Sequence, residues 1–252
     1  MTENVFLQPA TIDKASSVTD IVLNNYRTAD VFFKYNIEFC CGGKWPLEMA
    51  CTAQNLDVTE TIQALEKSSM PLHSSTAAEA HNWSTGFLID FIINVHHEYL
   101  RTALPITKEY INRFMEGHQT KFPWLQQLQA IITELHNKVI PFLRIEEETF
   151  FPYIDQITNA YVHGEPYAAL FAETLRKPLQ ATMRQEWERI NSLVRQMRQL
   201  TNDYTIPENA CVTHKVTFLK LQELDNDITQ HLYLENAILL PRAIKIEKEL
   251  LA

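Results

Sequence analysis

Apolar residues recur at helical spacing over four long stretches in the C-terminal two thirds of the chain. These stretches run from about Ser84 past His97, from Trp124 to Pro152, over residues 168–203 and from Pro207 to Leu240. Within each, the apolar side chains fall three or four positions apart, which places them on one face of a helix. Because short to moderate loops connect the four, the pattern predicts an all-α fold built on a four-helix bundle.

Shorter helical patterns precede the bundle. Apolar residues at helical spacing predict one helix over 18–35, capped by Ser17 or Thr19 and ended by the glycines of "CCGGK" (40–44), and a second over 56–67. The stretch that follows is small, polar and aperiodic, as linkers are. We therefore expect a small helical domain over residues 1–67, a linker over 68–82 and the bundle over 83–252.

Composition narrows the class of protein. Apolar residues make up 46% of the chain and only five residues are glycine, which favours a helical fold with a sizeable core. The formal net charge of -9 argues against a nucleic-acid partner. No apolar run reaches membrane-spanning length and the first residues carry no charged-then-apolar leader, so we expect a cytoplasmic protein that does not enter a membrane.

Two glutamates interrupt the apolar faces of the predicted helices. Glu146 lies within the face of the second long helix, and Glu235 lies within that of the fourth, one turn after His231. On the first long helix His97 falls on the apolar face, whereas its neighbour His96 is rotated away. Residues four apart on a helix lie on the same side, so His231 and Glu235 have the spacing of a chelating pair.

These four side chains predict a metal site in the bundle interior. A buried, unpaired carboxylate costs several kcal/mol, so a compensating group is required. Imidazole and carboxylate donors together suit iron, manganese or zinc. The alternative is a metal-free bundle that serves as an interaction module, with His97–Glu146 and His231–Glu235 as internal hydrogen-bonded pairs.

Four motifs resemble those of a known family. "YNIEFCCGGK" (35–44) resembles the N-terminal signature of the repair-of-iron-centres proteins, the ScdA-like iron–sulfur cluster repair family with a hemerythrin-like domain. "LIDFIINVHHEYL" (88–100), "EEETFFPYI" (146–154) and "HLYLENAILLPRA" (231–243) match its bundle motifs in the same order. The resemblance implies a di-iron bundle that helps to restore iron–sulfur clusters after nitrosative or oxidative damage. The partners it implies are damaged iron–sulfur proteins or the diatomics NO and O2. A homodimer is also compatible with it.

The resemblance also implies a ligand set that this chain does not keep in full. The family holds its irons with four histidines and two bridging glutamates, and four of these positions fall on His97, Glu146, His231 and Glu235. Phenylalanine (Phe142) stands at the position of the second-helix histidine, and tryptophan (Trp187 of "QEWER", 185–189) at that of the third. We therefore predict one iron per chain rather than two, with manganese or zinc as other candidates. A mononuclear sensor of O2 or NO, or an iron store, is the alternative function.

The chain has four cysteines, too few and too irregularly spaced for a disulfide framework. Cys40 and Cys41 are adjacent, so a disulfide between them would close a strained ring. Together with the family resemblance, their place near a helix end favours a redox site or a site of iron or NO transfer. The alternative is a pair of buried structural thiols, which is also what we expect of Cys51 and Cys211.

Overall fold

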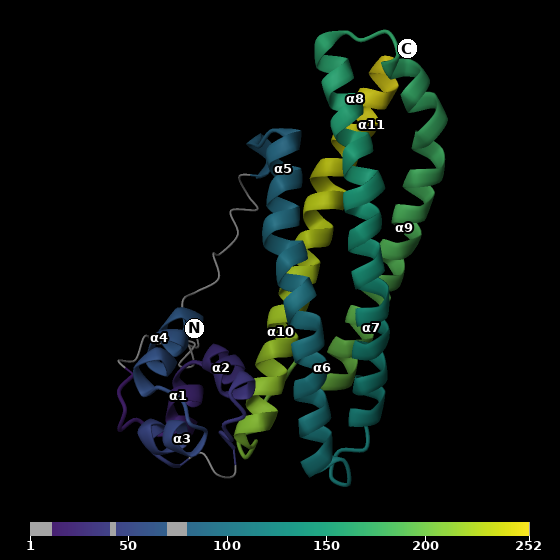
Figure 1. Ribbon diagram of the computed structural model, residues 1–252. Coiled ribbons are helices and arrows are strands. Elements are labelled where there is room, and N and C mark those ends of the chain that lie inside the picture. Colours follow the sequence, from purple (N-terminus) through teal and green to yellow (C-terminus); the bar gives the residue numbers. More distant parts are fainter. Residues whose placement is uncertain (1–11, 41–43, 70–79, 252) are drawn as a thin grey trace.

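The computed structural model describes residues 12–40, 44–69 and 80–251, without the side chains of residues 168, 171 and 174–182. Within these ranges the chain forms helices and no β-strand, which confirms the predicted all-α class. A cluster of short helices lies beside one end of a long four-helix bundle (Figure 1). Cys41, the N-terminal eleven residues and most of the predicted linker lie outside the described residues.

In residues 12–40 and 44–69 the small domain forms five short helices: α1 (Val18–Asn24), η1 (Tyr26–Thr28), α2 (Ala29–Lys34), α3 (Leu47–Ala53) and α4 (Val58–Ser69). Ser17 caps α1 by accepting a hydrogen bond from the backbone N–H of Asp20. The single helix predicted over 18–35 is wrong, because the backbone becomes extended at Asn25. The Asn25 side chain accepts from the N–H of Arg27 and donates to the carbonyl of Ser69, which ties the break to α4.

The four long helices of the bundle alternate in direction (Figure 1), and three of them are interrupted by a short π-helical segment. The first comprises α5 (Thr85–Phe91), η3 (Ile92–His97) and α6 (Glu98–His118). The second comprises α7 (Leu125–Ile145), η4 (Glu146–Phe150) and α8 (Phe151–His163), and the third is α9 (Ala168–Thr201). The fourth comprises α10 (Val212–Tyr233), η5 (Leu234–Leu239) and α11 (Leu240–Leu250). No helix in the described ranges combines the length and apolar character needed to cross a bilayer.

Several predicted helix ends differ from the observed ones. The second long helix does not end at Pro152 but continues to His163, because proline is tolerated in the first turn of α8, which follows the π-helical segment. The fourth begins at Val212 rather than at Pro207, and it extends to Leu250. In the small domain α2 ends at Lys34, so the helix stops before the glycines that were predicted to end it.

The small domain packs against α6 and α10 of the bundle. Its apolar core includes Tyr110 from α6 and Val216 from α10, both fully buried beside residues such as Phe32. Side chains of the two parts therefore share one core. This contact fixes where the start of α10 lies relative to residues 37–40 of the small domain.

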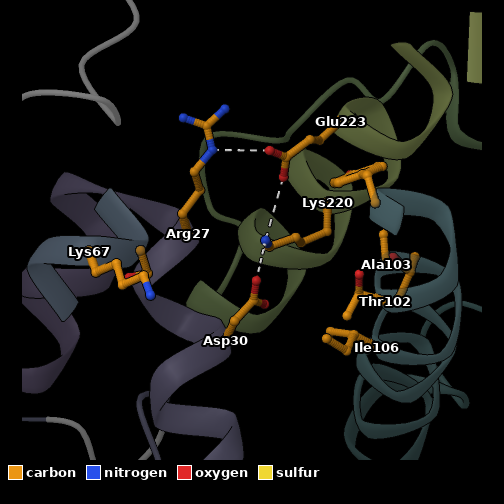
Figure 2. A pocket seen from close by; sticks show the side chains of 11 residues that line it. Arg27, Asp30, Lys67, Thr102, Ala103, Ile106, Lys220 and Glu223 are labelled. Carbon is orange, nitrogen blue, oxygen red and sulfur yellow. Dashed lines mark hydrogen bonds and ion pairs between the residues drawn. The ribbon is translucent and has the colours of Figure 1, made fainter. Parts of the chain in front are cut away.

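Charged side chains from the two parts meet in a pocket at the contact between them (Figure 2). Arg27 of the small domain contacts Glu223 of α10 at 3.0 Å, and Lys220 contacts Asp30 at 2.6 Å. These residues line a cavity of about 310 Å³ between the two parts. Because these charged side chains pair with one another across the contact, we assign them the role of stabilising the packing of the small domain on the bundle.

Candidate metal centre

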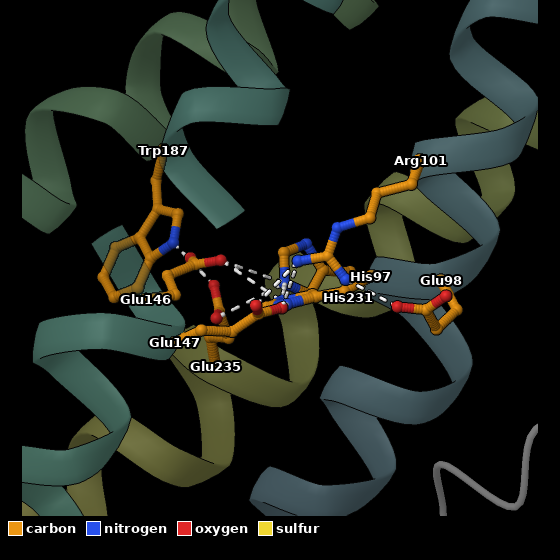
Figure 3. A network of polar contacts seen from close by, with 8 residues as sticks. All are labelled: His97, Glu98, Arg101, Glu146, Glu147, Trp187, His231 and Glu235. Carbon is orange, nitrogen blue, oxygen red and sulfur yellow. Dashed lines mark hydrogen bonds and ion pairs between the residues drawn. The ribbon is translucent and has the colours of Figure 1, made fainter. Parts of the chain in front are cut away.

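Four buried side chains meet in the middle of the bundle (Figure 3). His97 comes from the first long helix, Glu146 from the second, and His231 and Glu235 from the fourth, and none of them is more than 2% exposed. One donor atom from each lies within 4.8 Å of the others. These are the four residues that the sequence selected from the apolar helix faces.

Each of the three helices that carry these residues contains a π-helical segment at the metal centre. His97 ends η3, Glu146 begins η4, and Glu235 is the second residue of η5. The helix α9, which contributes none of the four, is α-helical throughout. A π-helical turn inserts one residue into the α-helical repeat, so it changes which side chains face inward, and such turns are frequent at functional sites. Regular helical periodicity did not reveal these segments.

The distances between donor atoms fit a metal ion. His97 Nε2 lies 3.2 Å from His231 Nε2 and 3.3 Å from Glu146 Oε2, and His231 Nε2 lies 3.4 Å from Glu235 Oε1. A metal ion bonded to nitrogen and oxygen donors at about 2.0–2.2 Å holds neighbouring donors roughly 3–3.5 Å apart. Both carboxylate oxygens of Glu146 and Oε1 of Glu235 are buried without a hydrogen-bond partner among the described residues. A bound cation would satisfy these oxygens.

The pKa shifts of the four groups also indicate that the site needs an additional positive charge. Burial lowers the pKa of His97 to about 3, with a further contribution from His231. Burial also raises the pKa of Glu146 well above its usual range, and the adjacent Glu235 carboxylate adds to the shift. Burial also disfavours the charged forms of His231 and Glu235. Their attraction for each other outweighs it, so the pKa of His231 is raised and the pKa of Glu235 is lowered. The protein's own groups therefore balance only one of the two carboxylates.

A second set of residues orients His97. Its Nδ1 donates to Glu147 Oε1 at 2.5 Å, and Arg101 donates to both oxygens of the same carboxylate at 2.6 and 2.7 Å. A proton held on Nδ1 leaves the Nε2 lone pair directed at the other three donors. Sequence reasoning missed Glu147, because it adjoins Glu146 in an acidic run and regular α-helical geometry would turn it away. The repeated glutamate beside an inward-facing one was the available signal.

His96 is buried as well, although it is not one of the four. Its Nδ1 lies 2.9 Å from Asp227 Oδ1, and its ring centroid lies 6.1 Å from that of His231. The sequence placed His96 away from the apolar face, but in the structure it is buried and contacts Asp227 of α10. The pair His96–Asp227 therefore connects the first and fourth helices beside the centre.

Two aromatic residues stand where the family resemblance implied histidines. Phe142 is buried in the apolar core one turn before Glu146. Trp187 of α9 is buried too, and its indole Nε1 donates a hydrogen bond of 2.7 Å to Glu235 Oε2 (Figure 3). Its neighbour Glu186 forms an ion pair with Arg189. An indole N–H is only a donor, so Trp187 satisfies a carboxylate oxygen but cannot bind a metal.

Cys40 belongs to the small domain and is not among the four converging residues. It is half-buried, and Cys41 lies outside the described residues. Cys51 is buried in the small-domain core, as expected. Cys211 differs from the expectation of a buried structural thiol, because it is only half-buried and forms a side-chain hydrogen bond with Cys40.

Two family models match the chain. Residues 14–69 match ScdA_N, described as a domain of unknown function, and residues 88–243 match the hemerythrin HHE cation binding domain. These matches agree with the resemblance seen in the sequence motifs. They cover the small domain and the bundle separately.

Curated relatives match over most of the chain. An iron–sulfur cluster repair protein ScdA of Staphylococcus epidermidis is 28% identical over 90% of this chain and 97% of its own length. Iron–sulfur cluster repair proteins YtfE of Enterobacter sp. and Dickeya chrysanthemi are 29% and 27% identical, over 89% and 92% of this chain and 94% and 97% of their own lengths. The resemblance to the cluster-repair family is thereby confirmed.

Proposed function

The chain belongs to the hemerythrin HHE cation-binding family, and we propose that it is a non-haem iron protein that takes part in the repair of iron–sulfur clusters. The relatives named above are iron–sulfur cluster repair proteins, and they align with this chain over nearly its whole length. Damaged iron–sulfur proteins are accordingly the proposed partners, and the cytoplasm is the proposed location.

The observation that carries the proposal is a set of buried carboxylate oxygens that accept no hydrogen bond from any described residue. Glu146 Oε1 and Oε2 and Glu235 Oε1 are removed from solvent at the point where His97 and His231 meet. Leaving an ionised carboxylate unpaired in a protein interior is costly, so this arrangement favours an occupant with positive charge. Two imidazoles and two carboxylates are donors that ferrous iron accepts readily, and manganese and zinc fit the same set.

We propose one iron per chain, held by His97, Glu146, His231 and Glu235. A bridging carboxylate uses one oxygen for each of two metals, but Glu235 Oε2 is already engaged by Trp187. Phe142, also buried, offers no donor atom at the other position where a histidine was implied. The aromatic pair therefore leaves donors for a single ion.

The protein's own residues prepare the centre for that ion. When bound, iron supplies a redox-active centre that can take up a diatomic such as NO or O2 or be passed to a client protein. Glu147 holds the proton of His97 on Nδ1, and Arg101 holds Glu147 in place. The apolar residues around the four donors exclude water, which strengthens every charge interaction inside. Cys40 and Cys41 are the proposed accessory residues for redox chemistry or for transfer of iron or NO.

A reconstitution experiment tests this function. The protein is loaded with ferrous iron without oxygen and mixed with a dehydratase whose [4Fe–4S] cluster has been damaged by NO, and the recovery of dehydratase activity is followed. The wild-type protein is expected to restore activity, and Glu235→Gln, which removes a charged donor at constant size, is expected to restore little. Glu148→Gln serves as the control, because Glu148 is exposed and its ion pair among the described residues is with Arg144. Recovery that is absent, or equal for all three proteins, would overturn the proposal.

A further inference from the structure

Two cysteines from different parts of the chain lie in contact across the domain interface. Cys40 follows the buried residue Phe39 in the small domain, and Cys211 is the N-cap residue of α10 in the bundle. Their neighbours lie in one apolar cluster, because Val212 packs against the cluster that contains Phe39. The two thiols therefore lie close enough to interact, although 171 positions separate them, the difference between 211 and 40. Both are half-buried, so small thiol reagents can reach them. Cys51, buried in the small-domain core, lacks such access.

A histidine completes the cluster. His118, at the end of α6, has its Nε2 3.5 Å from the sulfur of Cys211. Its Nδ1 lies 3.2 Å from the carbonyl oxygen of Phe114. Because a carbonyl oxygen only accepts hydrogen bonds, Nδ1 carries the proton and Nε2 presents a lone pair to the thiol. His118 is therefore placed to receive the proton of Cys211.

We propose that Cys40 and Cys211 form a redox-active dithiol that reacts with low-molecular-weight disulfides, such as glutathione disulfide, and closes a reversible disulfide between the small domain and the bundle. The inference deepens the redox role proposed for Cys40 and is independent of the metal centre. The partner it assigns to Cys40 in a disulfide is Cys211, because a disulfide with the adjacent Cys41 would be strained.

The order of the two steps follows from the surroundings of Cys211. The hydrogen bond to Cys40 and burial together raise its pKa, whereas the backbone N–H groups of Thr213 and His214 at the helix N-terminus act in the opposite direction. Before oxidation, Cys211 is thus held as the neutral thiol and Cys40 is the first nucleophile. Once Cys40 is in a mixed disulfide, its effect on Cys211 ends and that of the helix N-terminus remains.

The reaction balances with one disulfide co-reactant. The Cys40 thiolate, after losing its proton to solvent, attacks one sulfur of glutathione disulfide, forms a mixed disulfide and releases one glutathione thiolate. Cys211 gives its proton to His118 Nε2 and attacks the Cys40 sulfur, and the bond to the second glutathione breaks. Two protein thiols are thereby oxidised to one disulfide, and glutathione disulfide is reduced to two glutathione thiols.

Peptide mapping of the full-length protein tests the inference. The reduced chain is incubated with glutathione disulfide, blocked with an alkylating reagent, digested without reductant and analysed by mass spectrometry. We expect a peptide pair joined through Cys211 in the wild type and in Cys41→Ser and Cys51→Ser, and its complete loss in Cys40→Ser. In Cys211→Ser we expect a mixed disulfide to accumulate on Cys40, seen as the added mass of one glutathione.

Two results would overturn it: a stable glutathione adduct on Cys40 in the wild type, or a disulfide that joins only Cys40 to Cys41. The wild-type peptide map decides the question even if a serine variant folds poorly. Iron content is measured on the same reduced samples, so failure of the thiol site is distinguishable from failure of the metal proposal.

Discussion

The indole Nε1 of Trp187 donates a hydrogen bond of 2.7 Å to Oε2 of Glu235 in the interior of the bundle. Trp187 comes from α9, the long helix that contributes none of the four converging donors. One oxygen of Glu235 is thus satisfied by the protein itself, whereas the other lies 3.4 Å from His231 Nε2 and has no hydrogen-bond partner among the described residues. Only one oxygen of Glu235 is therefore open to a metal, which is the structural basis for expecting a single metal ion.

Trp187→Phe removes the donor while keeping an aromatic ring. In the metal-free protein Glu235 Oε2 is then buried without a partner, which costs about 1–3 kcal/mol of unfolding free energy. Urea denaturation at neutral pH measures this loss. Trp124→Phe is the control, because it removes the same part of a ring at a half-buried position where Trp124 packs against Phe218. Equal losses for both variants would mean that packing, rather than the hydrogen bond, accounts for the effect.

Glu147→Gln is predicted to weaken metal binding without removing a ligand. Glu147 accepts the hydrogen bond from His97 Nδ1 at 2.5 Å, and the charge it supplies increases the basicity of the imidazole. Loss of such a partner lowers metal affinity by about 10- to 100-fold. Competition with a chelator of known affinity measures the change. Glu148→Gln, at the exposed neighbouring position, should leave the affinity unaltered, and an unaltered affinity in Glu147→Gln would rule out this role.

Sequence reasoning identified the four converging side chains because a glutamate or histidine on an apolar helix face is visible in the pattern itself. His97, Glu146, His231 and Glu235 were all found in this way, and so was the four-helix class. The orienting residue Glu147 was not found, because its position depends on π-helical segments that leave no mark in apolar spacing. The break at Asn25 was also missed, and one of the two contacts of the Asn25 side chain is with Ser69, far along the sequence.

The contacts between the small domain and the bundle could not be predicted from the sequence either. Cys211 reads as an ordinary thiol before a helix, and nothing local to it indicates that Cys40 lies beside it. The packing of Val216 and Tyr110 into the small-domain core determines that contact. Long-range packing of this kind becomes visible only once the two parts are seen together.

His214 is predicted to make stability depend on pH independently of the metal. Burial lowers its pKa to about 4, with contributions from His118 and Lys121, and its ring packs against Phe114 and Phe218. The unfolded chain binds this proton near pH 6.5, whereas the folded chain resists binding it. The contribution of His214 to the free energy of unfolding is therefore complete above pH 6.5 and is lost as the pH falls towards 4.

Urea unfolding at pH 7 and pH 4.5 tests this assignment. His214→Leu, which cannot bind the proton, should reduce the fall in unfolding free energy between the two pH values by roughly 2 kcal/mol. His136→Leu, at a half-exposed position on α7, is the matched control and should retain the wild-type fall. A fall that is unchanged in His214→Leu would show that other groups carry the acid sensitivity.

The double variant Phe142→His and Trp187→His is predicted to create a second metal position. Phe142 stands one turn before Glu146, as His231 stands before Glu235, and replacement of Trp187 frees the second oxygen of Glu235. Metal content per chain should therefore rise towards two. Each single variant supplies only one imidazole and is expected to remain close to the wild-type content. A double variant with unchanged content would contradict the assignment of these two positions.

The amount of metal bound by the wild-type protein tests the central claim most directly. The protein is loaded with excess ferrous iron in the absence of oxygen, freed of unbound metal, and analysed by mass spectrometry of the elements against an accurate protein concentration. The account predicts one iron per chain, lost when His231 is replaced by alanine. A firm ratio of two irons per chain would contradict it.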